Sequence, residues 1–202
     1  MKVSSVHLDF PEAHALADLE GIRQDLEWIK SAKDFFDELK DSDATLREAL
    51  FYSVIIKYGR VFKGGIRKKL PQEFIESLNA DEIKRHKFFL DVRDKFIAHS
   101  VNDFELNHPL AYINNLDSEN PEFNQVHVAH ERILSLGKKF IHELVDLADI
   151  LLKKLNELFV IEKENVEKIA RKIPIEDLKR IKPKKSKFSL ESAGRVRHYK
   201  NK

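Results

Sequence analysis

One apolar stripe near the C-terminal end constrains the fold of this chain more than any other feature. Apolar side chains recur there at alternating intervals of three and four residues, at Ile141, Leu144, Ala148, Leu151, Leu155 and Leu158. This spacing is typical of an amphipathic helix. A stripe of this length can line the core of a helical bundle or the seam of a dimer, and the sequence leaves both alternatives open.

Most of the remaining chain shows the same helical spacing. Only six glycines and six prolines interrupt the 202 residues, and apolar stripes predict helices at about 19–39, 45–63, 71–78 and 81–98. Thr45 and Glu48 have the spacing of a capping box at the start of the second helix. We therefore expect an all-α bundle of four to five main helices in residues 1–178, followed by a basic, flexible tail at 179–202.

The helical periodicity stops between residues 100 and 124. Asparagine, aspartate, serine and proline are frequent there, which predicts one long polar loop. Loops of more than about 12–15 residues inside a compact domain tend to be functional or disordered. The one stretch that could form a strand is 124–129, and no alternating run of convincing length occurs elsewhere.

Composition excludes several classes of protein. The chain has no cysteine, which excludes disulfides, thiolate zinc sites, cysteine nucleophiles and iron–sulfur clusters. No run approaches the ~18 apolar residues that span a bilayer, and the first residues lack the apolar segment of a signal peptide. We expect a cytoplasmic protein with no membrane contact. His127 and His130, three apart on a possible helix, could hold a divalent metal only with a third ligand from elsewhere, so we expect no metal or other cofactor.

The net charge of +2 conceals an uneven distribution. Residues 179–202 contain ten lysines and arginines against one glutamate, a net of +9, which leaves 26 basic and 33 acidic residues, a net of −7, in residues 1–178. Such asymmetry is typical of a tail that contacts a polyanion. The candidate RNA contacts in this tail are Lys182, Lys184, Lys185 and Lys187. The alternative is a terminus that is solvated and binds nothing.

Arg93 does not fit its predicted surroundings. The helical neighbours three and four positions away are all apolar, namely Phe89, Leu90, Phe96 and Ile97. A guanidinium cannot lose its proton to avoid an apolar site, so it needs an acceptor or water. Asp94 is adjacent but points about 100° around a helix, and we therefore expect the partner of Arg93 to come from another helix, another subunit or a ligand phosphate.

His99 follows Arg93 by six residues, at the end of the same predicted helix. An imidazole, with an ordinary pKa near 6.5, can act as acid or base at neutral pH. RNA cleavage without a metal needs a base for the 2′-hydroxyl and a fixed cation that stabilises the phosphorane. On an ideal helix the two side chains would lie about 120° apart, so either the helix ends between them or a second chain completes the site. This geometry favours a homodimer.

Residues 93–100, Arg-Asp-Lys-Phe-Ile-Ala-His-Ser, resemble the R-x(4–6)-H motif of the HEPN superfamily, including the polar residue after the arginine. The resemblance implies an all-α bundle and a metal-independent endoribonuclease whose motifs from two subunits form one cleft, as in toxin–antitoxin, abortive-infection and CRISPR-associated ribonucleases. It implies that Arg93 stabilises the scissile phosphate, that His99 transfers the proton, and that Asp94 orients one of them. Lys95 would contact RNA, and an antitoxin protein would be a further partner.

Two hypotheses of other classes remain open. In the first, the bundle is a non-catalytic module that binds RNA, a nucleotide or a partner protein, with Arg93 as an anion anchor. In the second, it is a scaffold that dimerises through the stripe from Ile141 to Leu158. In both, Arg93 can form an ordinary salt bridge, and a protonated His99 would suit the negative C-terminal end of its helix.

Overall fold

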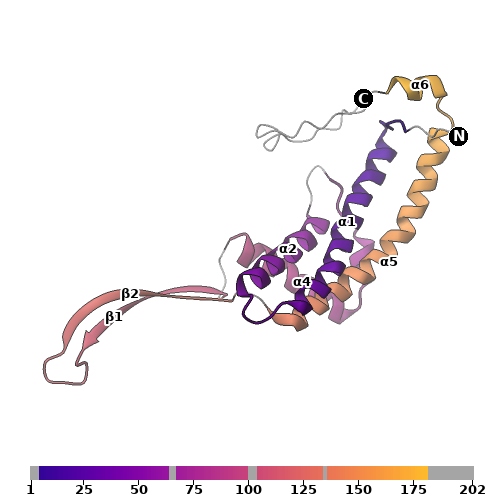
Figure 1. The fold of residues 1–202 in the computed structure, drawn as a ribbon. Helices are drawn as coiled ribbons and strands as arrows, with labels where there is room; N and C mark the ends of the chain where they lie inside the picture. Colours follow the sequence, from indigo (N-terminus) through magenta and orange to yellow (C-terminus); the bar gives the residue numbers. More distant parts are fainter. Residues whose placement is uncertain (1–4, 64–66, 100–103, 134–135, 182–202) are drawn as a thin grey trace.

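The computed structural model describes residues 5–63, 67–99, 104–133 and 136–181. Its helical elements are α1 (Pro11–Glu38), α2 (Ala44–Phe62), α3 (Glu73–Glu76), α4 (Ala80–Asp91), the π-helix η1 (Val92–Ile97), α5 (Gly137–Ala170) and α6 (Ile175–Arg180). Figure 1 shows α1 and α5 as two long neighbouring helices, with α2 and α4 packed beside them. The described part of the chain is therefore mostly helical, and four main helices form its body.

The apolar stripe of α5 lies in the core of this body. Ile141, Leu144, Leu151 and Leu155 are buried, and they pack in one cluster with the buried face of α1. Each such aliphatic side chain contributes roughly 1.5–3 kcal/mol when it is fully buried. Of the two alternatives that the sequence left open, the structure therefore supports the core and not the dimer seam.

Hydrogen bonds at the helix ends differ from the prediction. The capping box predicted at Thr45 and Glu48 is absent, because α2 already begins at Ala44 and places Thr45 inside its first turn. A capping box occurs instead at the start of α4. There Asn79 accepts a hydrogen bond from the backbone N–H of Glu82, whose carboxylate accepts one from the N–H of Asn79. This box fixes where the helix leading to Arg93 begins.

The expected long polar loop is in fact mostly a β-hairpin. Strands β1 (Glu105–Asn114) and β2 (Glu122–Arg132) pair antiparallel, so the prediction of a purely all-α fold is wrong for this segment. The short strand expected at 124–129 is confirmed as part of β2. Residues 115–121, which include two asparagines, one aspartate, one serine and one proline, form the connection between the strands, which is why turn signals dominated the segment.

The hairpin extends away from the helical body into solvent (Figure 1). Every residue of 106–128 has an exposed side chain. In the described residues, no helix combines the length and the apolar character that a bilayer span requires. Most of the predicted bundle at 1–178 is described, whereas the predicted tail at 179–202 lies outside the described residues from position 182 onward.

Candidate functional site

Arg93 and Asp94 form an ion pair at the surface of the body. Arg93 Nη1 donates a hydrogen bond to Asp94 Oδ1 at 2.7 Å, and Lys63 Nζ donates to Asp94 Oδ2 at 2.6 Å. The hydrogen bond from Lys63, and then the one from Arg93, lower the pKa of Asp94 below its ordinary value. The carboxylate is thus shared by two cations, and the group of three carries a net positive charge.

The expectation that Arg93 would find its partner elsewhere is wrong, because the adjacent Asp94 accepts its hydrogen bond. The local backbone also differs from the expected α-helix. Residues Val92–Ile97 form a π-helix in which the Ala98 N–H bonds to the Arg93 carbonyl oxygen, five residues back, at 3.1 Å. The ideal α-helix behind the expected 100° separation is therefore absent at this position. Single π-helical turns occur frequently at functional sites.

The apolar neighbours of Arg93 point into the core and do not surround the guanidinium. Phe89, Val92 and Phe96 are buried, and Phe96 contacts the rings of Tyr52 and Phe104 at centroid distances of 5.8 and 5.4 Å. Arg93 and Asp94 lie between these anchors with about a third of each side chain exposed, 34% and 35%. The core thus holds the backbone of the site while the charges stay in reach of solvent.

The stem of Arg93 crosses α2 at a glycine. A Cβ atom placed on Gly59, which is buried in the interior of α2, would lie 2.9 Å from Arg93 Cγ and 3.2 Å from Cδ. Carbon atoms in contact normally lie about 3.5–4.0 Å apart. A larger residue at 59 would therefore displace Arg93. Sequence reasoning missed this contact, because nothing in a lone helical glycine indicates what crosses it.

His99 is exposed in the turn that follows the π-helix, and the helix ends at Ile97. This agrees with one of the two alternatives stated above, that the helix ends between Arg93 and His99. Within the described residues, no side chain forms a hydrogen bond to the His99 imidazole. Lys95 is also exposed, and its Nζ lies 3.0 Å from Asp91 Oδ1 one turn earlier.

A second group of cations lies near the C-terminal end of α2, the helix that carries Gly59. Asp25 of α1 is buried, and its carboxylate accepts hydrogen bonds from Lys57 Nζ at 3.1 Å and Arg67 Nη1 at 2.9 Å. Arg60 Nε lies 3.7 Å from the same carboxylate. Three cations share one anion, so this end of α2 is also positively charged. Lys57 and Arg60 are three residues apart on α2, which could have revealed part of this group, whereas Arg67 follows the helix.

The two histidines considered as metal ligands lie on a strand and not on a helix. His127 and His130 are three residues apart on β2, which places their side chains on opposite faces. His130 Nδ1 is 2.6 Å from Asn107 Oδ1, and the His127 ring contacts the edge of Tyr112 at a centroid distance of 6.0 Å. No group of three or more candidate metal ligands occurs within the described ranges.

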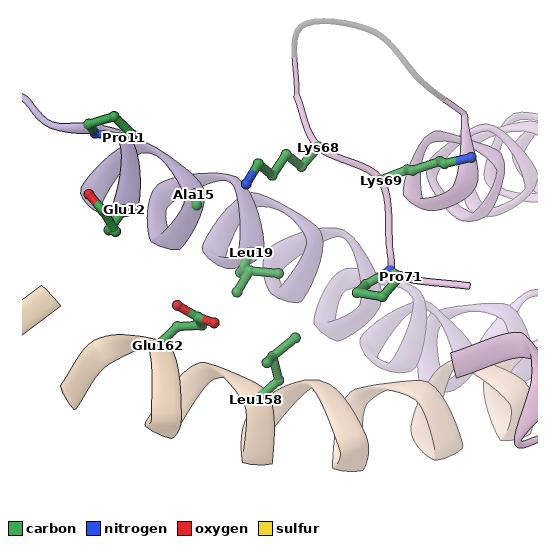
Figure 2. Close-up of a pocket in the computed structure, with 9 residues that line it drawn as sticks. All are labelled: Pro11, Glu12, Ala15, Leu19, Lys68, Lys69, Pro71, Leu158 and Glu162. Atoms are coloured by element: carbon green, nitrogen blue, oxygen red, sulfur yellow. The ribbon is translucent and has the colours of Figure 1, made fainter. Parts of the chain in front are cut away.

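A cleft of about 370 Å³ lies away from the residues predicted to be functional. It is lined by Pro11, Glu12, Ala15, Leu19, Lys68, Lys69, Pro71, Leu158 and Glu162. Figure 2 shows Leu19 of α1 and Leu158 of α5 facing each other across it, with Lys69 pointing away. None of the candidate catalytic residues lines this cleft. The tail lysines Lys182, Lys184, Lys185 and Lys187 lie outside the described residues.

The fold and the site together define a mostly helical protein with a projecting hairpin and a cationic Arg–Asp–Lys group beside a π-helix. No protein-family model, no curated protein and no solved structure matches this chain significantly. Function therefore has to be inferred from the chemistry of the site and from the short motif at residues 93–100.

Proposed function

We propose that the protein is a metal-independent endoribonuclease of the HEPN type that acts as a homodimer. The observation that carries the proposal is that Asp94 holds Arg93 at the surface while sharing its charge with Lys63. The Arg93–Asp94–Lys63 group therefore carries a net positive charge, and the guanidinium is held in one orientation facing solvent. Such a site suits the phosphodiester of RNA, which is a polyanion.

Arg93 is the residue that binds the scissile phosphate. Its guanidinium carries five N–H groups in a planar fork, and its hydrogen bond to Asp94 uses Nη1. The remaining donors can bind two phosphate oxygens at once, a geometry for which arginine is well suited. Asp94 is a positioning residue, because it keeps the guanidinium in one orientation. Lys63 and Lys95 add positive charge beside it.

His99 transfers the protons. A neutral imidazole takes the proton from the 2′-hydroxyl, the 2′-oxygen forms a bond to phosphorus, and the bond from phosphorus to the 5′-oxygen breaks. The 5′-oxygen then takes a proton from the protonated His99 of the other copy. The products are a 2′,3′-cyclic phosphate and a 5′-hydroxyl, and no metal or cofactor is consumed. One base and one acid are needed, which is why two copies of His99 serve the reaction.

The test is cleavage of an RNA pool by the full chain in buffer that contains EDTA. We expect wild-type protein to cut and to leave 2′,3′-cyclic phosphate ends, and Arg93→Ala and His99→Ala each to abolish cutting. Arg171→Ala and His108→Ala are matched controls, because both side chains are exposed and both residues lie outside the motif. Circular dichroism of each variant checks that the fold is retained.

Three results would contradict the proposal. The first is wild-type protein that cuts no RNA, the second is cutting that disappears with EDTA, and the third is cutting that survives both substitutions. The resemblance to HEPN proteins extends the proposal to a toxin or phage-defence effector restrained by an antitoxin protein. The tail residues Lys182, Lys184, Lys185 and Lys187 belong to it as electrostatic contacts to RNA.

A non-catalytic RNA-binding module is the second candidate. It is favoured by the exposed His99, which has no hydrogen-bonded side-chain partner in the described residues. In that case the same Arg93 group binds phosphate and no bond is broken. Wild-type protein that binds RNA without cutting it, and loses affinity on Arg93→Ala, would establish this alternative.

A further inference from the structure

The exposed side of α2 carries a row of cations. Lys57, Arg60 and Lys63 follow one another at intervals of three residues, and residues three apart are neighbours on the surface of a helix. At about 100° per residue the three occupy one side of α2. Phe51 and Tyr58 lie on the opposite side and are fully buried in the core. We call the three cationic side chains the α2 cation row.

The row joins the two groups of charges described above. Lys57 belongs to the group around Asp25, and Lys63 belongs to the group around Asp94. Arg60 lies between the two groups on α2, and its side chain is 56% exposed. Counting the arginine that completes each group, five cations share these two carboxylates, which leaves a net charge of +3. The two groups therefore form one continuous positive surface.

Acidic residues are absent from this part of the sequence. Between Glu48 and Glu73 the chain contains no aspartate or glutamate, but six lysines and arginines. Residues 1–178 as a whole carry a net charge of −7, so the positive surface is a local concentration and not a property of the whole body. Charge that is concentrated in this way attracts polyanions from solution.

Asp25 of α1 fixes part of this surface. Its side chain is only 7% exposed, and its carboxylate accepts hydrogen bonds from Lys57 and Arg67. Burying a carboxylate is costly, and well-packed apolar residues are often as stabilising as a buried ion pair. The particular effect of Asp25 is to hold together cations that would otherwise repel one another. Cations that are already ordered lose less entropy when they bind phosphates.

We propose that the α2 cation row binds the phosphates of single-stranded RNA and leads the strand to Arg93. The stem of Arg93 crosses α2 at Gly59, so its guanidinium and the row adjoin the same helix. This inference rests on the proposed function, because it names the path of that substrate beyond the cleaved bond. An anionic membrane is the other polyanion that a basic helix contacts. A membrane-bound helix inserts an apolar face, however, and the apolar face of α2 is buried in the core.

Trp28 provides a readout of this binding that needs no cleavage. It is the only tryptophan of the chain and is 36% exposed, and Lys57 Nζ lies 4.9 Å from the centre of its ring. RNA that binds Lys57 changes the surroundings of the indole. We therefore expect RNA to change the fluorescence of Trp28. The RNA used carries 2′-O-methyl groups, so that it cannot be cut through attack of a 2′-hydroxyl.

The test is the affinity of the full chain for a methylated RNA of about ten nucleotides, measured at several salt concentrations. Arg60→Gln removes one cation of the row, while Asp25 keeps both of its hydrogen bonds. We expect this variant to bind roughly fivefold more weakly at 0.1 M salt. The slope of log affinity against log salt should fall by about 0.7, the contribution of one phosphate contact on a single strand.

Arg171→Gln is the matched control, because it removes the same charge from an exposed side chain that lies 4.0 Å from the carboxylate of Glu167. This variant should bind the methylated RNA as the wild type does. Arg60→Lys keeps the positive charge of the row and should keep most of the affinity. Anisotropy of labelled RNA measures all the affinities, and the fluorescence of Trp28 shows where the RNA lies.

This proposal and the proposed nuclease activity can fail separately. If Arg60→Gln binds the methylated RNA as tightly as the wild type, or if neither binds it, the row is not the path of RNA, even where unmodified RNA is cut. If the row binds methylated RNA but the wild type cuts no unmodified RNA, the nuclease proposal fails and the row remains an RNA-binding surface. Phosphatidylserine vesicles that bind the wild type and not Arg60→Gln, with RNA affinity unchanged, would assign the row to a membrane.

Discussion

The contact between Gly59 and Arg93 supports the most discriminating prediction about the candidate site. Substituting Gly59→Ala adds one methyl group where a Cβ would lie 2.9 Å from Arg93 Cγ. That distance is about 0.6 Å shorter than the closest ordinary contact of about 3.5 Å. The clashing atom belongs to the stem of Arg93 and not to its flexible end, so the whole guanidinium must shift.

Two opposing effects set the change in the free energy of unfolding. Alanine is favoured over glycine inside a helix by about 1 kcal/mol, whereas overpacking a filled site costs about 1–3 kcal/mol. The exposed ion pair with Asp94 contributes no more than about 1 kcal/mol. We therefore expect the free energy of unfolding to fall by about 3 kcal/mol or less. A catalytic group displaced by about 1 Å can lose 10²-fold in rate, so RNA cleavage should fall by roughly 10- to 100-fold.

Gly21→Ala is the matched control, because Gly21 also lies inside a helix but its added Cβ would meet Arg67 at 3.4 and 3.5 Å, nearly ordinary contact. This variant should be as stable as wild type or more stable, with unchanged cleavage. Urea unfolding and RNA cleavage are measured for both variants, and the ¹⁵Nε resonance of Arg93 reports its displacement without any activity. If Gly59→Ala behaves like Gly21→Ala in all three measurements, the positioning role of Gly59 is refuted.

Two further predictions concern buried polar groups. Asp25→Asn leaves Lys57 and Arg67 without their buried carboxylate and should lower the free energy of urea unfolding by about 3 kcal/mol. Asp149→Asn, which loses two exposed or partly exposed pairs with Lys30 and Lys153, should cost about 1 kcal/mol or less, and equal losses for the two variants would contradict this reasoning. Burial lowers the pKa of His86, so the unfolded chain binds its proton more readily. The free energy of unfolding should therefore decrease as pH falls below about 6.5. His86→Phe should flatten this dependence on pH, and an unchanged slope would contradict the assignment of the effect to His86.

Much of the helical body could be predicted from local pattern. The stripe from Ile141 to Leu158 predicted α5, and the stripes before it predicted α1, α2 and α4 within a few residues of their observed ends at most boundaries. The apolar positions of these helices recur every three or four residues because one side of each helix is buried. Such a signal is contained in each segment by itself.

The hairpin was not predicted, and the reason is physical. Both sides of its strands are exposed, so burial does not impose a clear alternation of apolar and polar residues. A bulge at Asn124 also shifts the alternation by one residue within β2. The turn-forming residues between 114 and 121 then outweighed the short apolar runs on either side.

The candidate site was only partly accessible to prediction. Arg93, Asp94 and His99 were proposed from their sequence motif, and the pairing of Arg93 with Asp94 was not expected, because adjacent side chains on an α-helix point about 100° apart. Neither Lys63 nor Gly59 was associated with Arg93. Both are about thirty residues earlier in the chain, and only the packing of α2 against the π-helix brings them together.

The local order of residues thus determined which segments become helices, which side of each is buried, and which cation and titratable ring occur six residues apart in one short motif. These properties depend on neighbours within one or two helical turns. The tertiary structure alone decided that Asp94 is shared by two cations, that a glycine admits the arginine stem, and that the hairpin extends into solvent. Those features depend on atoms distant in the chain, and they arise only when burial of the common core fixes the helices against one another.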